Sequence, residues 1–390
     1  MRAMALNRLG QRVWFVLASL GIGAAAFLFS DLFEPAQTKT WFFGEGYARM
    51  ADAPFACDST FPHRILGPLL AHVLGFGSAH YWLFSHVVLV LLFAALAGQA
   101  VRTGTSWAGA SLLVATLSLT RGPALFKGFV GYTEPLSLLL LVSSLAAVNR
   151  PVWFWSIQLL SLLNHEQILF FWPWLLLQRR LAGGSWRADA VGAAAVAGLY
   201  ALFRWLVDQH APAQLYTPAN YIGWIQQPPL VVLGMTVVTV VMLLIAFGVL
   251  PALLAWHAAV DRRRVTGFGI ALFLASMFAL CCIALDVFRF VAYALIPIWL
   301  AGIELVKRRR GAWIFAGLGA VSGVVLAMSP SLFGWLLGAF MANQPDPASA
   351  LIRTVIPEHP ERFVAIGLAV LAIAVAGWIW GRRDRRRSAT

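Results

Sequence analysis

The sequence predicts an all-α, polytopic helical membrane protein with about 12 transmembrane helices, in which residues 1–390 form a single transmembrane domain. Three observations support this fold class. Hydrophobic residues make up 60% of the chain and charged residues only 12%, which is far from the composition of a soluble globular domain. Apolar runs long enough to cross about 30 Å of hydrocarbon recur along the whole sequence. Short basic tracts separate these runs, as expected where Lys and Arg stay on the cytoplasmic side.

The first half of the chain contains six expected spans. The first, about 13–30, follows three arginines and is predicted to be an uncleaved helix that leaves the basic N-terminus in the cytoplasm. Three more are expected at 79–101, 106–120 and 135–149, because each stretch is apolar and is followed by an arginine. The run 151–178 is too long for one span and is broken by the polar sequence NHEQ, so it is divided into two spans that meet at an outer turn.

The second half repeats the pattern of apolar run and basic tract. Spans are expected at 188–206, 229–256, 267–285, 290–306, 312–339 and 363–380. The basic tracts at 262–264, 307–310 and 382–387 fall on the inner side of the membrane. Both termini are therefore predicted to be cytoplasmic, with 381–390 as a basic tail. With these boundaries most of the Lys and Arg lie inside, whereas most of the Asp and Glu lie outside.

Residues 31–77 form the predicted first outer loop, which is polar, acidic and aromatic. The carboxylates in it are Asp31, Glu34, Glu45, Asp52 and Asp58. The segment GEGYARMA fits an interfacial helix, because Phe43, Tyr47 and Met50 share one face at spacings of three and four. Residues 64–77 fit a second interfacial helix, because they are short for a crossing and contain Gly and Pro.

Asp31 and Glu45 are the candidate catalytic carboxylates. Asp31 directly follows the first span, where a helix end can aim its carboxylate into a cleft, and Glu45 lies in the interfacial helix. A carboxylate at a membrane surface can accept a proton from a hydroxyl group or coordinate a cation. The alternatives are a boundary charge or helix cap for Asp31 and a solvated helix face for Glu45.

Further ionisable residues are predicted at the outer ends of spans, where such groups usually face a cavity or a partner rather than lipid. They are Arg64, Arg121, Lys127, Glu134, His165, Glu166, Asp286 and Arg289. Arg64 suits a phosphate, or it snorkels to the interface. Arg121 and Lys127 supply positive charge for an anion or for Glu134. His165 is a structural residue in the simpler interpretation.

The pair Asp286 and Arg289 leaves two interpretations open. The two residues lie one turn apart, so a salt bridge between them would pin the end of a helix. The alternative is that Arg289 holds a lipid phosphate at the level of the membrane surface.

Several classes of function find no support in the sequence. Three cysteines give neither a disulfide framework nor the spacing of a zinc site, and no metal site is predicted. The sequence contains no P-loop, Rossmann glycine pattern or nucleophile elbow. A net charge of +13 would suggest nucleic-acid binding in a soluble protein, but here the basic tracts lie between spans, so no nucleic-acid partner is expected.

Short segments within residues 13–310 resemble the GT-C superfamily of polytopic membrane glycosyltransferases. They are GEGYARMA, FPHRILGP, YTEPL, NHEQ and LDVFRFVAYALIP. The resemblance implies an inverting enzyme of the cell inner membrane that transfers a sugar from a polyprenyl-phosphate donor to an acceptor on the outer face. The base is then Asp31 by position or Glu45 by motif, although Glu45 stands where the family usually has Asp. The cations expected to stabilise the leaving phosphate are Arg64, Arg121, Lys127 or Arg289.

The resemblance also sets the expected partners. They are membrane lipid, the polyprenyl-phosphate sugar and proteins of envelope-glycan assembly; no cofactor is implied, and a divalent metal is left open. A secondary transporter of a small solute is the first alternative, although no two-half repeat is visible and charges avoid mid-span positions. The second alternative is a non-catalytic scaffold of an envelope polysaccharide complex.

Overall fold

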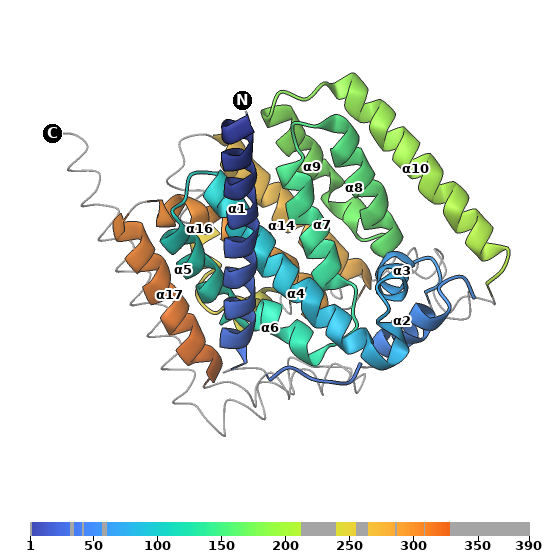
Figure 1. Cartoon of the computed structure of the whole chain (residues 1–390), viewed down its shortest axis with the longest axis horizontal. Coiled ribbons are helices and arrows are strands. Elements are labelled where there is room, and N and C mark those ends of the chain that lie inside the picture. Colours follow the sequence, from blue (N-terminus) through green and yellow to red (C-terminus); the bar gives the residue numbers. More distant parts are fainter. Residues whose placement is uncertain are drawn as a thin grey trace.

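The computed structural model describes residues 2–31, 35–40, 43–56, 61–211, 239–254, 264–284, 287–307 and 309–327. Within these ranges every regular element is a helix and none is a strand, which confirms the all-α prediction. A long helix, α4 (Gly77–Arg102), lies at the centre (Figure 1). It contacts α1 (Arg2–Ser30), α2 (Phe43–Asp52), α5 (Trp107–Ser118) and α7 (Glu134–Ala146).

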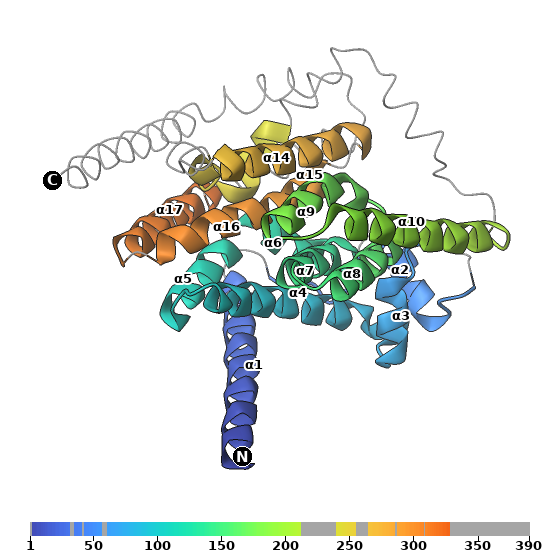
Figure 2. The ribbon, with the colours of Figure 1, turned by 90° about the horizontal axis from the view of Figure 1, so that it is seen from above.

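Small residues allow α1 and α4 to pack closely. A Cβ added to Gly23 would lie 2.5 Å from the Val90 carbonyl oxygen, and one added to Gly98 would lie 2.9 Å from the Ser19 hydroxyl. Such contacts suit helix association in a membrane, where lipid competes with larger apolar side chains for the same surface. The N-terminal part of α1 projects beyond the other helices (Figure 2).

The helices that surround the candidate site lie at the end of the molecule opposite the N-terminus of α1. Besides α2, they include α3 (Leu66–Val73) and α6 (Arg121–Gly128) (Figure 1). α7 begins nearby with Glu134 and Pro135; proline suits a first helical turn, where its missing N–H leaves no hydrogen bond unmade. Three further helices complete this half of the chain: α8 (Pro151–Asn164), α9 (Ile168–Leu181) and α10 (Trp186–Asp208).

The later described helices close the other side of the core. They are α14 (Arg264–Ala284), α15 (Val287–Phe290), η1 (Val291–Ala294), α16 (Leu295–Val306) and α17 (Arg309–Ala327). All four residues of η1 are fully buried, and η1 contacts both α6 and α14. α15 directly precedes η1, and its residues Val287 and Phe290 are buried in the same core.

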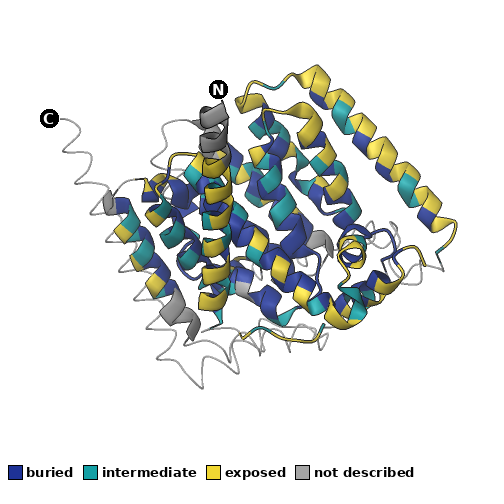
Figure 3. Ribbon diagram, viewed as in Figure 1, coloured by how far each residue is buried: buried dark blue, intermediate teal, exposed yellow. Residues whose placement is uncertain are grey.

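Three of the described helices are long and apolar enough to cross a membrane: Gly10–Ser30, Gly77–Arg102 and Trp186–Asp208. Large apolar side chains such as Trp14 and Val191 are exposed on α1 and α10, whose surfaces are largely uncovered (Figure 3). Lipid is the solvent that suits such a surface. The chain is therefore a membrane-associated helical protein.

Several other expected spans are shorter helices. α5, α7, α8 and α9 have 12, 13, 14 and 14 residues. At 1.5 Å per residue they are about 18 to 21 Å long, less than the roughly 30 Å of a hydrocarbon core. The expectation of 12 crossings is therefore not confirmed by the described residues and stays a prediction. Residues 328–339 of the expected span 312–339, the span 363–380 and the tail 381–390 lie outside the described residues.

One expected span, 229–256, is interrupted by a turn. Residues 239–247 are helical, but a turn occupies 248–251. Gly248 has a φ of +59°, and a Cβ added to it would lie 2.6 Å from the Cβ of Ser322 on α17. The Val249 N–H, which leaves the helical pattern here, donates to the Ser322 hydroxyl at 3.1 Å. The sequence did not predict this turn, because the close approach of two distant segments leaves no mark on the hydropathy of the chain.

Candidate functional site

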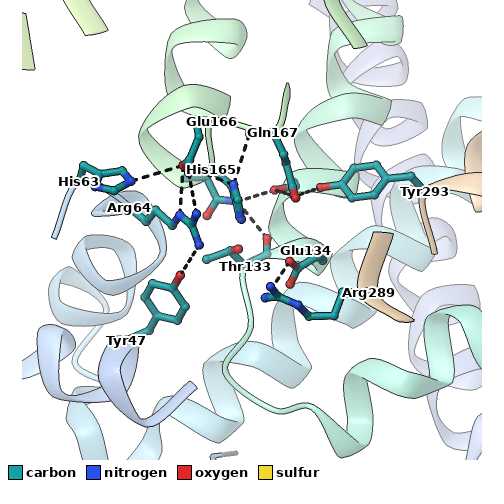
Figure 4. Close-up of polar contacts among 12 residues, drawn as sticks. Tyr47, His63, Arg64, Thr133, Glu134, His165, Glu166, Gln167, Arg289 and Tyr293 are labelled. Carbon is teal, nitrogen blue, oxygen red and sulfur yellow. Dashed lines mark hydrogen bonds and ion pairs between the residues drawn. The ribbon is translucent and has the colours of Figure 1, made fainter. Parts of the chain in front are cut away.

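The candidate site is a network of polar side chains from segments far apart in the sequence. They come from α2, the turn before α3, the start of α7, the turn between α8 and α9, α15 and η1 (Figure 4). Its two ion pairs are Arg64–Glu166 and Glu134–Arg289. Ionisable groups among apolar helices are usually paired in this way, because an isolated charge there is costly.

Arg64 holds Glu166 through both oxygens of the carboxylate. Its Nε donates to Oε2 at 3.1 Å and its Nη2 donates to Oε1 at 2.6 Å, the two-point geometry that a guanidinium favours. Its Nη1 donates to the Tyr47 hydroxyl at 3.1 Å, and its Cζ lies 4.0 Å from the centre of the Phe61 ring. Arg64 thus joins α2 to the turn between α8 and α9.

Two histidines lie against the same carboxylate. Nε2 of His63 is 3.5 Å and Nδ1 of His165 is 3.4 Å from Oε2 of Glu166. His165 Nδ1 faces both this carboxylate and the Gln167 backbone N–H, which lies 3.3 Å from it. Nε2 of His165 is buried without a hydrogen-bond partner among the described residues.

The environment fixes the charge states of these three groups. Burial, together with the Arg64 charge, lowers the pKa of His165 to about 3. Burial also lowers the pKa of His63, against the raising effect of Glu166. For Glu166, burial acts to raise the pKa, but the Arg64 charge and the neighbouring imidazoles outweigh it and hold that pKa well below its usual range. At neutral pH the group is therefore one carboxylate, one guanidinium and two neutral imidazoles.

The second ion pair joins α7 to α15. Nη1 of Arg289 lies 3.1 Å from Oε1 of Glu134, which is fully buried at the first position of α7. A carboxylate at a helix N-terminus is favoured by the helix dipole, and the arginine supplies the opposite charge. Cζ of Arg289 lies 4.6 Å from the centre of the Tyr132 ring. Asp286, the other predicted partner of Arg289, lies outside the described residues.

A buried set of neutral hydrogen bonds adjoins the ion pairs. Asn164 donates through Nδ2 to the Thr133 carbonyl at 2.9 Å and to the Ser137 hydroxyl at 2.8 Å. Gln167 contacts the hydroxyl of Tyr293 in η1 through its Nε2. These bonds tie the turn between α8 and α9 to α7 and η1, and they fix the orientation of His165 and Glu166 between them.

Asp31 lies in a separate ion pair with Lys127. Lys127 is fully buried on α6, where its Nζ contacts Asp31 Oδ1 and donates to the Phe27 carbonyl at 2.8 Å. The side chain of Asp31 remains 38% exposed. Asp31 is therefore the counter-ion that binds the end of α1 to α6, and part of its side chain stays accessible.

Glu45 and Arg121 occupy other positions at the same end of the molecule. Glu45 is exposed on α2, and none of the described residues forms an ion pair with it. The buried side of the same helix carries Tyr47 and Met50, as the spacing in the sequence predicts. Arg121 is the first residue of α6 and is half-buried.

Eight of the ten predicted site residues fall into three groups; the other two are Arg121, at the start of α6, and Asp286, outside the described residues. The structure brings Arg64, Glu134, His165, Glu166 and Arg289 together, pairs Asp31 with Lys127, and leaves Glu45 on the outside of α2. Seven members of the network were not predicted as site residues: Tyr47, His63, Thr133, Ser137, Asn164, Gln167 and Tyr293. The signal of Thr133, Ser137 and Tyr293 in the sequence is weak, since each is a single polar residue next to an apolar run.

No known protein family matches this chain. No curated protein and no solved structure matches it either. Among the described residues, no three His, Cys, Asp or Glu side chains are arranged to hold a metal ion.

Proposed function

We propose that this protein is a GT-C-like glycosyltransferase of the cell inner membrane, with about 12 spans and both termini in the cytoplasm. It transfers a sugar from a polyprenyl-phosphate donor to an acceptor on the outer face. One observation carries the proposal: all five segments that resemble the superfamily contribute a side chain to the network in Figure 4. The contributing residues are Tyr47, Arg64, Glu134, Glu166 and Arg289.

The meeting of these five segments in one network favours the proposal, because likeness in sequence does not by itself require the segments to lie close together. Arg64 and Glu166 are 102 residues apart, yet they form a two-point ion pair. Segments selected only for their likeness to a family have no reason to meet in a chain of unrelated fold. Their meeting at one end of the helices, beside an exposed acidic helix, fits a shared binding site.

The proposed base is Asp31 or Glu45. Glu134 and Glu166 are poor candidates: Glu134 is fully buried beside Arg289, and both carboxylate oxygens of Glu166 accept from Arg64. Glu45 offers an exposed carboxylate. Asp31 is also held by a cation, Lys127, which makes it a weaker proton acceptor, but its side chain is 38% exposed and so remains within reach of an acceptor. In the reaction the acceptor hydroxyl loses its proton to the base, and its oxygen forms the new bond to the anomeric carbon. The bond from that carbon to the phosphate oxygen breaks, and polyprenyl phosphate leaves.

The charge that develops on the leaving phosphate requires nearby cations. Arg64 is the weakest of the four predicted residues for this role, since Nε, Nη1 and Nη2 already donate to Glu166 and Tyr47. We assign Arg64 instead to positioning these two side chains. Arg121, half-buried at the start of α6, is the proposed cation for the phosphate. Lys127 and Arg289 would take this role only by exchanging their present partners, Asp31 and Glu134, for the phosphate.

Release of polyprenyl phosphate tests the proposal without knowledge of the acceptor. The purified protein is mixed with polyprenyl-phosphate hexoses and pentoses and an extract of envelope glycans, and free polyprenyl phosphate is measured by mass spectrometry. One donor should be consumed, and Asp31→Asn combined with Glu45→Gln should reduce the rate by 10²-fold or more. Asp52→Asn, an exposed acid on the same helix as Glu45, serves as the control and should retain activity. Consumption that survives loss of both Asp31 and Glu45 would contradict the proposed base.

A further inference from the structure

A groove of about 570 Å³ runs between α8 and α10, away from the network described above. Its volume falls within the range of small-molecule binding clefts. Trp155 and Leu159 line it from α8, and Ala195 and Leu199 line it from α10. Arg187, at the start of α10, is the one charged residue among the residues that line it.

The groove exists because α10 carries small residues where it faces α8. A Cβ added to Gly192 would lie 2.3 Å from Cδ1 and Nε1 of Trp155, so the helices touch where the glycine meets the indole ring. Ala188 and Ala195, one turn to either side, are too small to fill the space beside this contact. The result is an apolar trough along the two helices.

Exposed aromatic residues lie at the end of the groove that carries Arg187. Trp153 near the start of α8 is 65% exposed, and Trp186 at the start of α10 is 62% exposed. Exposed tryptophans of this kind concentrate at the interface between hydrocarbon and water. The Arg187 guanidinium lies 5.6 Å from the centre of the Trp186 ring, so this charge stands at the level of lipid headgroups.

The end of the groove at Arg187 is positively charged, because no acidic residue is among the residues that line the groove. The nearby Asp189 is 3% exposed and forms an ion pair with Arg179, which is also buried. An anionic headgroup at Arg187 therefore meets an attractive potential, and its hydrocarbon chain meets apolar side chains along the trough.

We propose that this groove binds one anionic phospholipid. Arg187 contacts the phosphate and the acyl chain lies along Trp155, Ala195 and Leu199. The site is independent of the proposed glycosyl transfer. Its charged end is at Pro151, whereas His165 of the network follows the other end of the 14-residue helix α8, about 21 Å away at 1.5 Å per residue. A phosphate held at Arg187 is therefore too distant to be that of a donor reacting at the network.

Native mass spectrometry of the full chain in detergent tests the headgroup preference. The protein is titrated with phosphatidylglycerol or phosphatidylcholine of identical acyl chains, and bound lipids are counted. One phosphatidylglycerol should bind more tightly than any phosphatidylcholine, and Arg187→Gln should weaken it about five-fold, the effect of one surface arginine. The matched control is Arg102→Gln, which removes another exposed arginine at a helix end and should leave the affinity unchanged.

A second pair of variants tests the trough itself. Ala195→Trp fills the groove and should abolish tight binding, whereas Ala194→Trp places the same ring on an adjacent exposed position that does not line it. Equal binding of the two lipids, or equal effects within either pair of variants, overturns the proposal. Tighter, Arg187-dependent binding of a polyprenyl phosphate also overturns it, because the occupant is then a lipid of the donor class.

Discussion

Replacing Arg64 with methionine removes a buried cation and keeps most of the apolar stem. Arg64 is 4% exposed, and the carboxylate that it holds is 20% exposed on its side chain. Breaking a buried ion pair typically costs about 3 to 5 kcal/mol, because the remaining charge stays desolvated. The partial exposure of Glu166 places the expected loss near the lower limit, at about 3 kcal/mol of unfolding free energy. The Tyr47 hydroxyl loses a donor as well, which adds about 1 kcal/mol.

A second substitution separates the cost of the unpaired Glu166 carboxylate from a general loss of packing, because it removes that charge. In the double variant Arg64→Met with Glu166→Gln, no carboxylate remains to be desolvated. We expect the total loss to fall to about 2 kcal/mol, the cost of the unsatisfied neutral groups. The two substitutions are therefore strongly non-additive, as contacting charged partners should be.

Reversible unfolding in mixed micelles, followed by tryptophan fluorescence, measures these free energies. The control is Lys307→Met, which breaks the exposed pair between Lys307 and Glu304 at 2.7 Å. That pair should contribute no more than about 0.5 kcal/mol. The stabilising role of the Arg64–Glu166 ion pair is refuted if Arg64→Met lowers the free energy of unfolding no more than Lys307→Met does. It is also refuted if the double variant loses the sum of the free energies that Arg64→Met and Glu166→Gln lose singly.

Two further predictions concern pH and backbone strain. Because the pKa of His165 is about 3 in the folded protein and about 6.5 in the unfolded chain, stability should be constant above pH 6.5 and fall below it, by about 1.4 kcal/mol at pH 5.5. The pKa of the buried His63 is lowered as well, so His165→Asn should remove part, and not all, of the difference in melting temperature between pH 7.5 and pH 5.5. Gly248→Ala should cost about 1 to 3 kcal/mol, because φ is +59° and a Cβ there collides with Ser322. Gly198→Ala, in the open interior of α10, should be neutral or stabilising in the same unfolding measurement.

Each of these predictions has an outcome that contradicts it. A melting temperature that is unchanged from pH 7.5 to 5.5 would mean that His165 takes up a proton as easily in the folded state as in the unfolded chain. Equal effects of alanine at Gly248 and at Gly198 would mean that the turn after 247 needs no left-handed residue.

Much of the helical organisation is predictable because hydropathy and charge act locally. The break at 164–167 was visible as a polar tetrapeptide inside an apolar run, and α8 and α9 do end on either side of it. The face of α2 that carries Tyr47 and Met50 follows from helical spacing alone. The turn at Gly248 was not predictable, because it depends on contact with Ser322, 74 positions further along the chain.

The choice of partners within the site was also beyond the sequence. Placement at the ends of apolar runs indicates that Glu134 and Glu166 need a counter-charge, since an unpaired one is costly there. It does not indicate that Arg289 and Arg64 provide it, because those contacts depend on how distant helices pack. Asp31 illustrates the same limit: its place after the first span suggested an acid aimed at a cleft, and the structure adds a buried lysine from α6.

In the proposed reaction, the end of the molecule that carries the network and α2 lies on the outer side of the membrane and transfers a sugar there from a polyprenyl phosphate. Sealed, right-side-out vesicles that contain the protein and a labelled donor test it most directly, with an envelope-glycan acceptor that cannot cross the membrane added outside. Label should appear on the external acceptor, and the combined Asp31→Asn and Glu45→Gln variant should abolish the transfer. Label that reaches the acceptor only when the vesicles are opened, or equally in that variant, would contradict the proposal.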